Sequence, residues 1–586
     1  MMSSEDMEDK GEEKDISKEK LGFFSGIWGA VEGKFPQLAK KLKDIRVQAF
    51  LLFLILLIFY LNLITWDFSN SPDSIGYGLT LKNWFEKGNI DNYDLLRPSH
   101  PLVMPLAILF TYLMVPLIGP NYLLSFAILD AILGAGTVAI FYLVCYIFVH
   151  NRKLSLICSL GLAFSFAFWY HCEMAEDRSL CFILFTLYIP VLFSFMGEIK
   201  PFRRFEALKT WQKGLFTGLL LGLTVAAHIT FVLVFLFTLI LGWKYFGLKF
   251  FKSARFIWFL IGTVMVCGIV FGATAWALEV GTVGEFFGIF TGYHAGGRGE
   301  IYFALANPES FSLVSQFQGL TGGVFTTVFM FISDSPGYRA AIIGVGAAVF
   351  LVMAYFIIYA RKNRVVNSLY ILMVIWFVHY FFFSPDDRNS WVYLLIPIWL
   401  VVCVSANIML REGVTLMLAK RRLSDKAMKA LTPVIITLVV IILLNNIFVF
   451  ADAHFNQDER KKLAQFVDDN IPDDNAIIIV DDSTVTFFNY YSEKEALDFR
   501  DIILNSQISD YVNDSFSDGD AIYIADFWIN DSYIVAEGVR YKQSYDERLA
   551  QHREYITAFN SMYTYELAFE YEWSNIYRIT AVNETR

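Results

Sequence analysis

The sequence predicts a polytopic α-helical membrane protein that carries a soluble α/β domain at its C-terminal end. Apolar residues make up 56% of the 586 residues, and the mean hydropathy is +0.47, which is more apolar side chain than a soluble core of this length needs. Charge also changes abruptly along the chain. Residues 455–586 carry 11 Lys and Arg against 26 Asp and Glu, whereas residues 1–454 carry 36 against 31. This change predicts a domain boundary near His454.

The chain begins with a charged segment. Residues 1–45 mix acids and lysines and lack the apolar core and small-residue cleavage site of a signal peptide. We therefore expect a cytoplasmic tail over 1–45, followed by a transmembrane domain over 46–451.

The transmembrane domain is defined by its apolar runs. A helix needs about 20 apolar residues to cross a hydrocarbon core of about 30 Å. Suitable runs lie near 47–65, 102–118, 122–149, 154–170, 179–196, 214–243, 253–279, 339–360, 366–383, 391–410 and 432–451. These runs predict about 11–13 transmembrane helices.

Basic loops predict the orientation of the helices. Lys and Arg concentrate in loops 200–213, 361–364 and 411–429, which we expect to be cytoplasmic. Counting helices from these loops places the loops 171–178, 280–338 and 384–390 on the outer side, together with the C-terminal domain. A cytoplasmic N-terminal tail requires the 66–100 loop to lie on the outer side as well.

Simple counting leaves Arg152–Lys153 and the basic segment 244–255 on the wrong side. The runs 122–149 and 214–243 are unusually long and hold polar or small residues in the middle, among them Asp130 and His228. We interpret each run as a pair of short or broken helices, although one strongly tilted helix is an alternative. His228 is then either a site residue near a helix break or a histidine bonded to a neighbouring helix.

The C-terminal residues 452–586 predict an extracytoplasmic acidic α/β domain. DERKKLAQFVDDN and DERLAQHREYITAF have helical patterns, AIIIVDD and AIYIADF resemble buried strands, and AFEYEWSNIYRITAV resembles a closing strand pair. Three glycosylation triplets, at Asn513, Asn530 and Asn583, agree with an external location. Asp481–Asp482 follows a strand without a Gly-rich phosphate loop, which favours a solvated turn over a nucleotide site.

All six cysteines lie in or beside apolar runs, so the pattern argues against a disulfide framework or a structural zinc site. No nucleic-acid partner is expected.

Ionisable residues recur in every predicted outer loop and are candidates for function because such groups are costly beside a bilayer. They are Asp73, Glu86, Arg97 and His100; His171, Glu173, Glu176, Asp177 and Arg178; His294, Arg298 and Glu300; and Asp386, Asp387 and Arg388. Cations of this kind could hold a phosphate leaving group while a carboxylate deprotonates an acceptor. Several of these residues have simpler explanations. Glu86 can lie on a solvent-exposed helix face, Arg178 can anchor the start of its helix, and Asp386–Arg388 can form a local ion pair.

Four segments, in this order, carry a resemblance to a known family. They are PDSIGYGLTLKNW followed by RPSHPLVMPLAILF, then GLAFSFAFWYHCEMAEDRSLCFILF, GLLLGLTVAAHITFVLVFLF and SPDDRNSWVYLLIPIWL. Over most of residues 50–410 the chain resembles the GT-C superfamily of polytopic membrane glycosyltransferases, in the branch related to protein O-mannosyltransferases. The sequence departs from related members at Ile75, Gly76 and Tyr77, where an acid commonly follows the Asp-Ser pair, and it lacks the WWDYG signature of oligosaccharyltransferases.

The resemblance implies an enzyme that transfers a sugar, a hexose such as mannose, from a polyprenyl-phosphate donor to a protein, lipid or glycan acceptor on the extracytoplasmic face. It implies Asp73 as the catalytic base, His100 and Glu176 as residues lining the site, and Arg388 and His228 as contacts to the donor phosphate or lipid. No metal or other cofactor is expected. The competing hypotheses are a lipid or solute transporter with an extracytoplasmic domain, and a membrane scaffold whose acidic domain binds partners.

Overall fold

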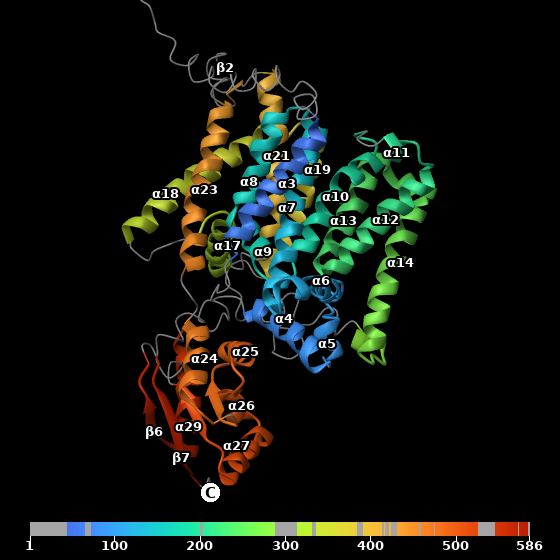
Figure 1. Cartoon of the computed structure of the whole chain (residues 1–586). Coiled ribbons are helices and arrows are strands. Elements are labelled where there is room, and N and C mark those ends of the chain that lie inside the picture. The colour runs from blue at the N-terminus through green and yellow to red at the C-terminus, as the bar shows by residue number, and fades with distance from the viewer. Residues whose placement is uncertain are drawn as a thin grey trace, which may run out of the picture.

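The computed structural model in Figure 1 consists of a helical bundle and a smaller domain beyond one end of it. It describes residues 44–586 except for 65–71, 89, 200–202, 287–312, 331–335, 384–390, 413–414, 417–420, 423–430, 456–458, 474, 526–544, 572–573 and 584–586. Of the expected outer loops, 384–390 and most of 280–338 therefore lie outside the described residues. The expected domain boundaries stay predictions.

The first half of the bundle contains α3 (Ile45–Asn62), α4 (Pro72–Lys82), η1 (Asn83–Lys87), α5 (Asn92–Leu95), α6 (Val103–Ile118), α7 (Tyr122–Val149), α8 (Arg152–Phe164), α9 (Phe166–Glu173), α10 (Ser179–Phe195) and α11 (Arg203–Glu206). The second half contains α12 (Thr210–Ala227), η2 (Ile229–Phe231), α13 (Val232–Phe246), η3 (Gly247–Lys252), α14 (Ala254–Ala277), α17 (Leu313–Val328), α18 (Pro336–Tyr359), α19 (Arg364–Phe383), η4 (Val392–Leu394), α21 (Leu395–Glu412) and α23 (Leu431–Phe455), with a two-residue strand pair, β1 (Thr415–Leu416) and β2 (Arg421–Arg422).

Within the described residues, eight helices are long and apolar enough to cross a membrane, and the bent pair α8 and α9 would make nine. The protein is therefore a multi-pass membrane protein, as predicted. The count is lower than the 11–13 helices expected because α6 and α10 have only 16 and 17 residues. In addition, the first turn of α12 contains Gln212 and Lys213, which makes this helix less apolar.

The described residues of the basic loops gather at one end of the bundle, opposite the C-terminal domain (Figure 1). Four contacts connect them: Arg411 donates to the Val149 carbonyl at 3.2 Å, Arg255 donates to the Phe195 carbonyl at 2.9 Å, Lys244 donates to Asn367 at 2.7 Å, and Arg364 lies 3.2 Å from Glu198. Arg152–Lys153 and 244–255, which simple counting misplaced, thus join the other basic segments. This is the distribution that the positive-inside rule associates with a single membrane face.

Helix α6 explains why the counting failed. Its 16 residues extend about 24 Å, less than a hydrocarbon core. Just before it, His100 contacts Asp177, and just after it, the Leu123 amide donates to the hydroxyl of Tyr490 in the C-terminal domain. Both ends of α6 therefore lie toward the C-terminal domain, so the 102–118 run does not cross the bundle.

The two long runs behave differently from each other. The preferred interpretation of 122–149 as a broken pair is wrong, and the alternative of a single helix is correct, because α7 is one continuous helix of 28 residues. The expected break in 214–243 is confirmed: α12 ends at Ala227, His228 has extended backbone angles, and the chain continues through η2 into α13. An unexpected break occurs in 154–170, where α8 and α9 meet at Ser165 at an angle of 67°.

Helices α12 and α14 pack at unusually close range because glycines face the contact. A Cβ atom at Gly218 would lie 2.0 Å from the Phe259 carbonyl oxygen, and one at Gly262 would lie 2.6 Å from the Leu215 carbonyl oxygen. Small residues allow this approach between helices in a membrane. The contact holds α12, and therefore the break at its end, in a fixed position.

The C-terminal domain has an α/β fold, in agreement with the prediction. Its elements are α24 (Glu459–Asn470), β3 (Ile477–Val480), α25 (Asp482–Tyr491), β4 (Glu495–Asp498), α26 (Phe499–Leu504), α27 (Ser506–Asp518), β5 (Ile522–Ala525), α29 (Tyr545–Met562), β6 (Tyr563–Phe569) and β7 (Ile576–Val582). The sheet order is β4-β3-β5-β7-β6, with β3, β4 and β5 parallel and β7 antiparallel to its neighbours. Sequence patterns did not predict β4 or helices α25, α26 and α27.

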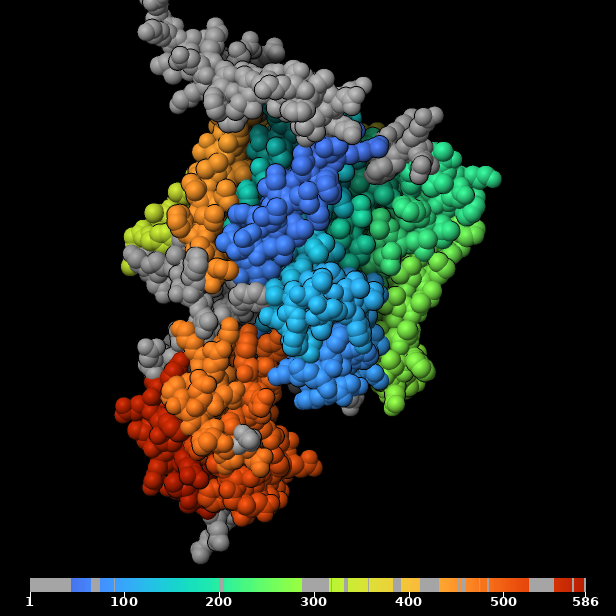
Figure 2. Space-filling view, viewed as in Figure 1, coloured from blue at the N-terminus to red at the C-terminus, as the bar shows by residue number. Residues whose placement is uncertain are grey.

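Helix α25 joins this domain to the bundle. The Lys82 ammonium group at the end of α4 donates to the Tyr490 carbonyl oxygen at 3.0 Å. In Figure 2 the orange surface of the domain touches the light-blue surface formed by the first loop and the start of α7. The described part of the first loop, residues 72–88 and 90–100, thus lies between the bundle and the C-terminal domain.

Candidate functional site

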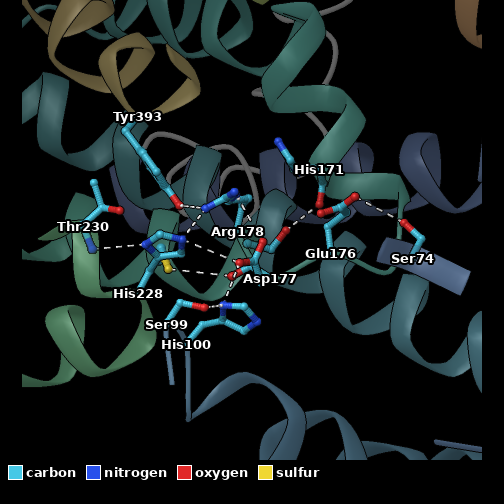
Figure 3. A network of polar contacts seen from close by, with 12 residues as sticks. Ser74, Ser99, His100, His171, Glu176, Asp177, Arg178, His228, Thr230 and Tyr393 are labelled. Carbon is cyan, nitrogen blue, oxygen red and sulfur yellow. Dashed lines mark hydrogen bonds and ion pairs between the residues drawn. The ribbon is translucent and has the colours of Figure 1, made fainter. Parts of the chain in front are cut away.

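Polar side chains from four parts of the bundle meet at its end nearest to the C-terminal domain. His100 precedes α6, Asp177 and Arg178 lie in the turn between α9 and α10, His228 occupies the break between α12 and η2, and Tyr393 lies in η4 (Figure 3). We call these five residues the polar cluster. All except Arg178, which is half-buried, are buried.

Asp177 is the centre of the polar cluster. Its carboxylate lies 3.1 Å from His100 Nδ1, 3.2 Å from Arg178 Nε and 3.7 Å from His228 Nε2 (Figure 3). Burial alone would raise the pKa of this carboxyl, but the neighbouring Arg178, followed by His100 and His228, outweighs burial and lowers its pKa below the usual value. Asp177 is therefore a buried carboxylate that stays ionised.

Arg178 connects two further residues to Asp177. Its guanidinium contacts His228 Nε2 and donates to the Tyr393 hydroxyl at 2.9 Å. The other imidazole nitrogen of His228, Nδ1, accepts from the Thr230 amide at 3.2 Å. The break in the helix is what makes this possible, because it exposes a backbone N–H and turns the imidazole toward the cluster.

His100 is held by both of its ring nitrogens. Nε2 lies 2.7 Å from the Tyr77 hydroxyl and Nδ1 lies 2.8 Å from the Ser99 hydroxyl, in addition to its contact with Asp177. Burial lowers the pKa of His100 to about 4, with Asp177 opposing and Arg97 and Arg178 adding to the decrease. The imidazole is therefore neutral at pH 7.

The first loop is also fixed to the helix break through the backbone. The Ile229 amide donates to the Ser99 carbonyl oxygen at 2.8 Å. Arg97, three residues before His100, lies over the Tyr77 ring at 4.1 Å. The His100–Pro101 step therefore has a defined place against η2.

Glu176 connects the cluster to helix α4. Its Oε1 accepts from the Ser74 hydroxyl at 3.3 Å, and its backbone amide donates to Asp130 Oδ2 at 2.9 Å (Figure 3 shows Ser74 and Glu176). Asp130 is only 1% exposed, on the third turn of α7. Asp130 therefore fixes the backbone at Glu176, the residue before Asp177.

The five predicted site residues have different outcomes. The structure brings His100 and His228 together in the polar cluster, with Glu176 beside it. Asp73 lies at the start of α4, next to Ser74, so its backbone is at the same end of the helix as the Ser74–Glu176 contact. Arg388 lies outside the described residues.

Other residues of the site were not selected from the sequence. Asp177 and Arg178 were included among the ionisable outer residues without a role, and Arg178 was also explained as an anchor. Tyr77 was noted only as a departure from the family pattern, and Tyr393 carried no signal, because one tyrosine among many aromatic residues has no distinguishing pattern. Asp130 was noted only as a polar residue in an apolar run, although a buried carboxyl group there is itself an indication of function.

His100, Asp177 and His228 have the atom types that bind divalent metals. Their nitrogen and oxygen atoms lie within 4.8 Å of one another. Among the described residues, these three form the group of His, Cys, Asp and Glu side chains close enough together to hold a metal ion. The Arg178 guanidinium already contacts Asp177 and His228, so it supplies a positive charge among these atoms. A metal ion bound there would have to displace this guanidinium.

No family model and no curated protein matches the chain. Among solved structures, it is similar to ArnT from Cupriavidus metallidurans bound to undecaprenyl phosphate, with 10% identity, a TM-score of 0.53, and coverage of 92% of this chain and 99% of that one. The apo structure of the same ArnT gives 10% identity, a TM-score of 0.54, and coverage of 90% and 97%. The archaeal oligosaccharyltransferase AglB from Archaeoglobus fulgidus has 10% identity and a TM-score of 0.49. The match covers 92% of this chain and 74% of that one. The similarity to ArnT shows a GT-C-like fold for this chain.

Proposed function

We propose that this protein is a membrane glycosyltransferase that moves one sugar from a polyprenyl-phosphate donor to an acceptor hydroxyl on the extracytoplasmic face. The observation that carries the proposal is the polar cluster, in which a buried carboxylate, an arginine and two histidines from separate elements meet beside α4. The GT-C-like fold supports it, since the ArnT of similar fold was crystallised with undecaprenyl phosphate.

The donor phosphate would bind beside the cations of the site. Arg178 and Arg97 are partly exposed, with 15% and 21% of their side-chain surfaces accessible. Guanidinium groups suit phosphate because they donate paired hydrogen bonds and keep their charge. They would stabilise the negative charge that develops on the leaving phosphate. We propose Arg388 and His228 as further contacts to the phosphate or the lipid.

Asp73 is our candidate for the general base. Its carboxylate would take the proton from the acceptor hydroxyl while the hydroxyl oxygen bonds to the anomeric carbon and the bond from that carbon to the phosphate oxygen breaks. The products are the glycosylated acceptor and polyprenyl phosphate, with inversion at the anomeric carbon. Asp177 is less suited to this role, because its carboxylate is already bound by Arg178 and His100. The expectation for the sugar is a hexose such as mannose, and the branch related to protein O-mannosyltransferases stays a prediction.

The site would lie on the outer side of the membrane. Basic loops gather at the opposite end of the bundle, and such loops favour the cytoplasm. With that end inside, the polar cluster, the first loop and the C-terminal domain are all extracytoplasmic. A polyprenyl-phosphate sugar whose head group has been moved to the outer leaflet would reach the site from that leaflet.

The direct test uses purified full-length protein, a radiolabelled polyprenyl-phosphate sugar and a membrane extract as the acceptor source. We expect the wild type to transfer label and the Asp73→Asn variant to transfer it at least 100-fold more slowly. Asp91→Asn is the matched control, since it makes the same exchange in the same loop, and asparagine can keep the N-cap that Asp91 provides to α5. Equal transfer by wild type and Asp73→Asn would remove Asp73 from the mechanism.

The transporter and scaffold hypotheses predict different results in a proteoliposome transport assay. A transporter would move labelled lipid or solute between leaflets of a proteoliposome without changing it, whereas a scaffold would do neither. Wild-type protein that moves the intact donor but releases no polyprenyl phosphate would contradict the glycosyltransferase proposal.

A further inference from the structure

We propose that a pocket between the first loop and the C-terminal domain binds a neutral sugar ring of a carbohydrate-containing acceptor. This inference rests on the proposed function and names the chemical class of the acceptor. The pocket has a volume of about 410 Å³ and is lined by η1, the ends of α4 and α6, the start of α7 and the end of α25. We call it the tyrosine pocket, and its chemically informative residues are Lys82, Glu86, Asn121, Tyr122, Tyr490 and Tyr491.

The walls of the tyrosine pocket are held in place by contacts between the two domains. The Leu123 amide donates to the Tyr490 hydroxyl at 3.1 Å, and Lys82 donates to the Tyr490 carbonyl oxygen at 3.0 Å. Helix α4 comes so close that a Cβ atom on Gly78 would lie 3.1 Å from the Tyr490 ring. The pocket therefore exists before any ligand binds, which limits the entropy lost on binding.

The aromatic rings of the pocket suit a pyranose. Tyr122 stacks on Phe85 with ring centroids 5.4 Å apart, and Tyr491 stands at 88° to Tyr490 at 4.8 Å. These contacts fix the orientation of the rings. The face of an aromatic ring is electron-rich and attracts the weakly positive C–H groups that a sugar ring presents on one side.

The polar groups of the pocket suit a molecule with several hydroxyl groups. Glu86 is an acceptor beside the Tyr122 hydroxyl, Lys82 is a donor, and Asn121 is a side-chain amide. One cation and one carboxylate balance each other, so the pocket favours a neutral polyol over a phosphate or another anion. Its volume falls within the range of about 300–1,000 Å³ that is typical of small-molecule sites.

The position of the pocket fits a remote part of the acceptor. Helix α4 runs from Pro72, next to Asp73, to Lys82 at the pocket, which corresponds to about 14 Å along a helix. The ring in the tyrosine pocket is therefore a separate unit from the one whose hydroxyl reacts. Binding energy from such remote groups can orient an acceptor for the chemical step.

The first test measures sugar binding alone. Full-length protein in nanodiscs would be examined by saturation-transfer NMR with methyl glycosides and disaccharides of glucose, mannose and galactose as probes. We expect ring protons of at least one probe to receive saturation, and Glu86→Ala and Tyr491→Ala to reduce it at least threefold. Lys87→Ala, an exposed neighbour that does not line the pocket, should have no effect. No saturation with any probe, or equal saturation in wild type and Glu86→Ala, would overturn the inference.

The second test separates this inference from the proposed function. With donor and acceptor assayed together, Glu86→Ala should raise the acceptor KM about tenfold and leave the donor KM unchanged. Transfer with an unchanged acceptor KM overturns the acceptor role of the pocket while the glycosyltransferase proposal stands. Sugar binding by a protein that transfers nothing overturns the glycosyltransferase proposal and leaves the pocket as a carbohydrate site.

Discussion

His100 Nδ1 lies 3.1 Å from the carboxylate of Asp177, and this contact joins the loop before α6 to the turn between α9 and α10. Each side chain is less than a tenth exposed, so the interaction is shielded from solvent and salt. The contact brings together the two loops that carry most of the candidate site.

Asp177→Asn should reduce both transfer and stability. The substitution leaves Arg178 without its carboxylate partner, and removing one member of a buried ion pair costs about 3–5 kcal/mol. We expect a lower unfolding temperature and a rate reduced at least 100-fold, measured by thermal unfolding in detergent and by the transfer assay. Glu198→Gln, which affects the Arg364 ion pair at the opposite end of the bundle, is the control. A variant with wild-type stability would show that Asp177 is not the partner of Arg178.

Acidification should destabilise the protein through His100. An unfolded histidine binds a proton near pH 6.5, whereas in the folded protein burial lowers the pKa of His100 to about 4. The unfolded state therefore binds more protons between these values. The stability contributed by neutral His100 is complete above about pH 6.5 and is lost as the pH falls toward 4.

The measurement compares the free energy of unfolding of wild type and His100→Asn at several pH values. The wild type should lose roughly 3 kcal/mol more than the variant between pH 6.5 and 4, from about 1.4 kcal/mol per pKa unit. His150→Asn at the opposite end is the control, because asparagine tolerates the left-handed backbone there, with φ at 53°. Parallel curves for wild type and His100→Asn would contradict the prediction.

Asp130 should act by positioning Glu176. Asp130→Ala removes the acceptor for the Glu176 amide, whereas Asp130→Asn keeps an oxygen that can accept the same bond. We expect Asp130→Ala to lower kcat about tenfold or more and Asp130→Asn to restore most of it, with the donor KM similar in both. Similar kcat values in the two variants, at equal thermal stability, would mean that the hydrogen bond has no part in positioning.

The orientation of the bundle can be tested by cysteine labelling. Among the native cysteines only Cys267 is not fully buried, so labelling would use a Cys267→Ser background. Cysteine at Lys87, near the C-terminal domain, should react with an impermeant reagent in intact cells. Cysteine at Lys153 should react only after the membrane is opened. Both positions are exposed. Labelling of both from outside would contradict the proposed topology.

Sequence patterns predicted the membrane helices and the α/β domain because both depend on local periodicity. Hydropathy placed the apolar runs, but it could not distinguish α6, which stays at one end, from a helix that crosses, since both are apolar. A break in α7 was expected because Asp130 is a polar residue inside an apolar run. Asp130 is tolerated inside the continuous helix because it accepts a hydrogen bond from the Glu176 amide.

The candidate site was predicted only in part for a related reason. His100, Glu176 and His228 were selected because the resemblance to GT-C enzymes implied roles for them among the many ionisable residues near the membrane edge. Their mutual distances depend on how α12, α14 and the first loop pack, which no local pattern contains. Asp177 and Arg178 are adjacent in the sequence, so their roles could not be separated until the contacts with His100 and Tyr393 were known.

The hydrogen bond between the Ile229 amide and the Ser99 carbonyl oxygen uses only main-chain atoms. Its existence is therefore independent of the side chains at both positions, apart from proline at 229, which has no N–H to donate. A saturation library at 229 should for this reason lose far more activity at proline than at other small or apolar residues. For protein engineering, this means that the side chain at position 229 can be varied while the first loop keeps its alignment.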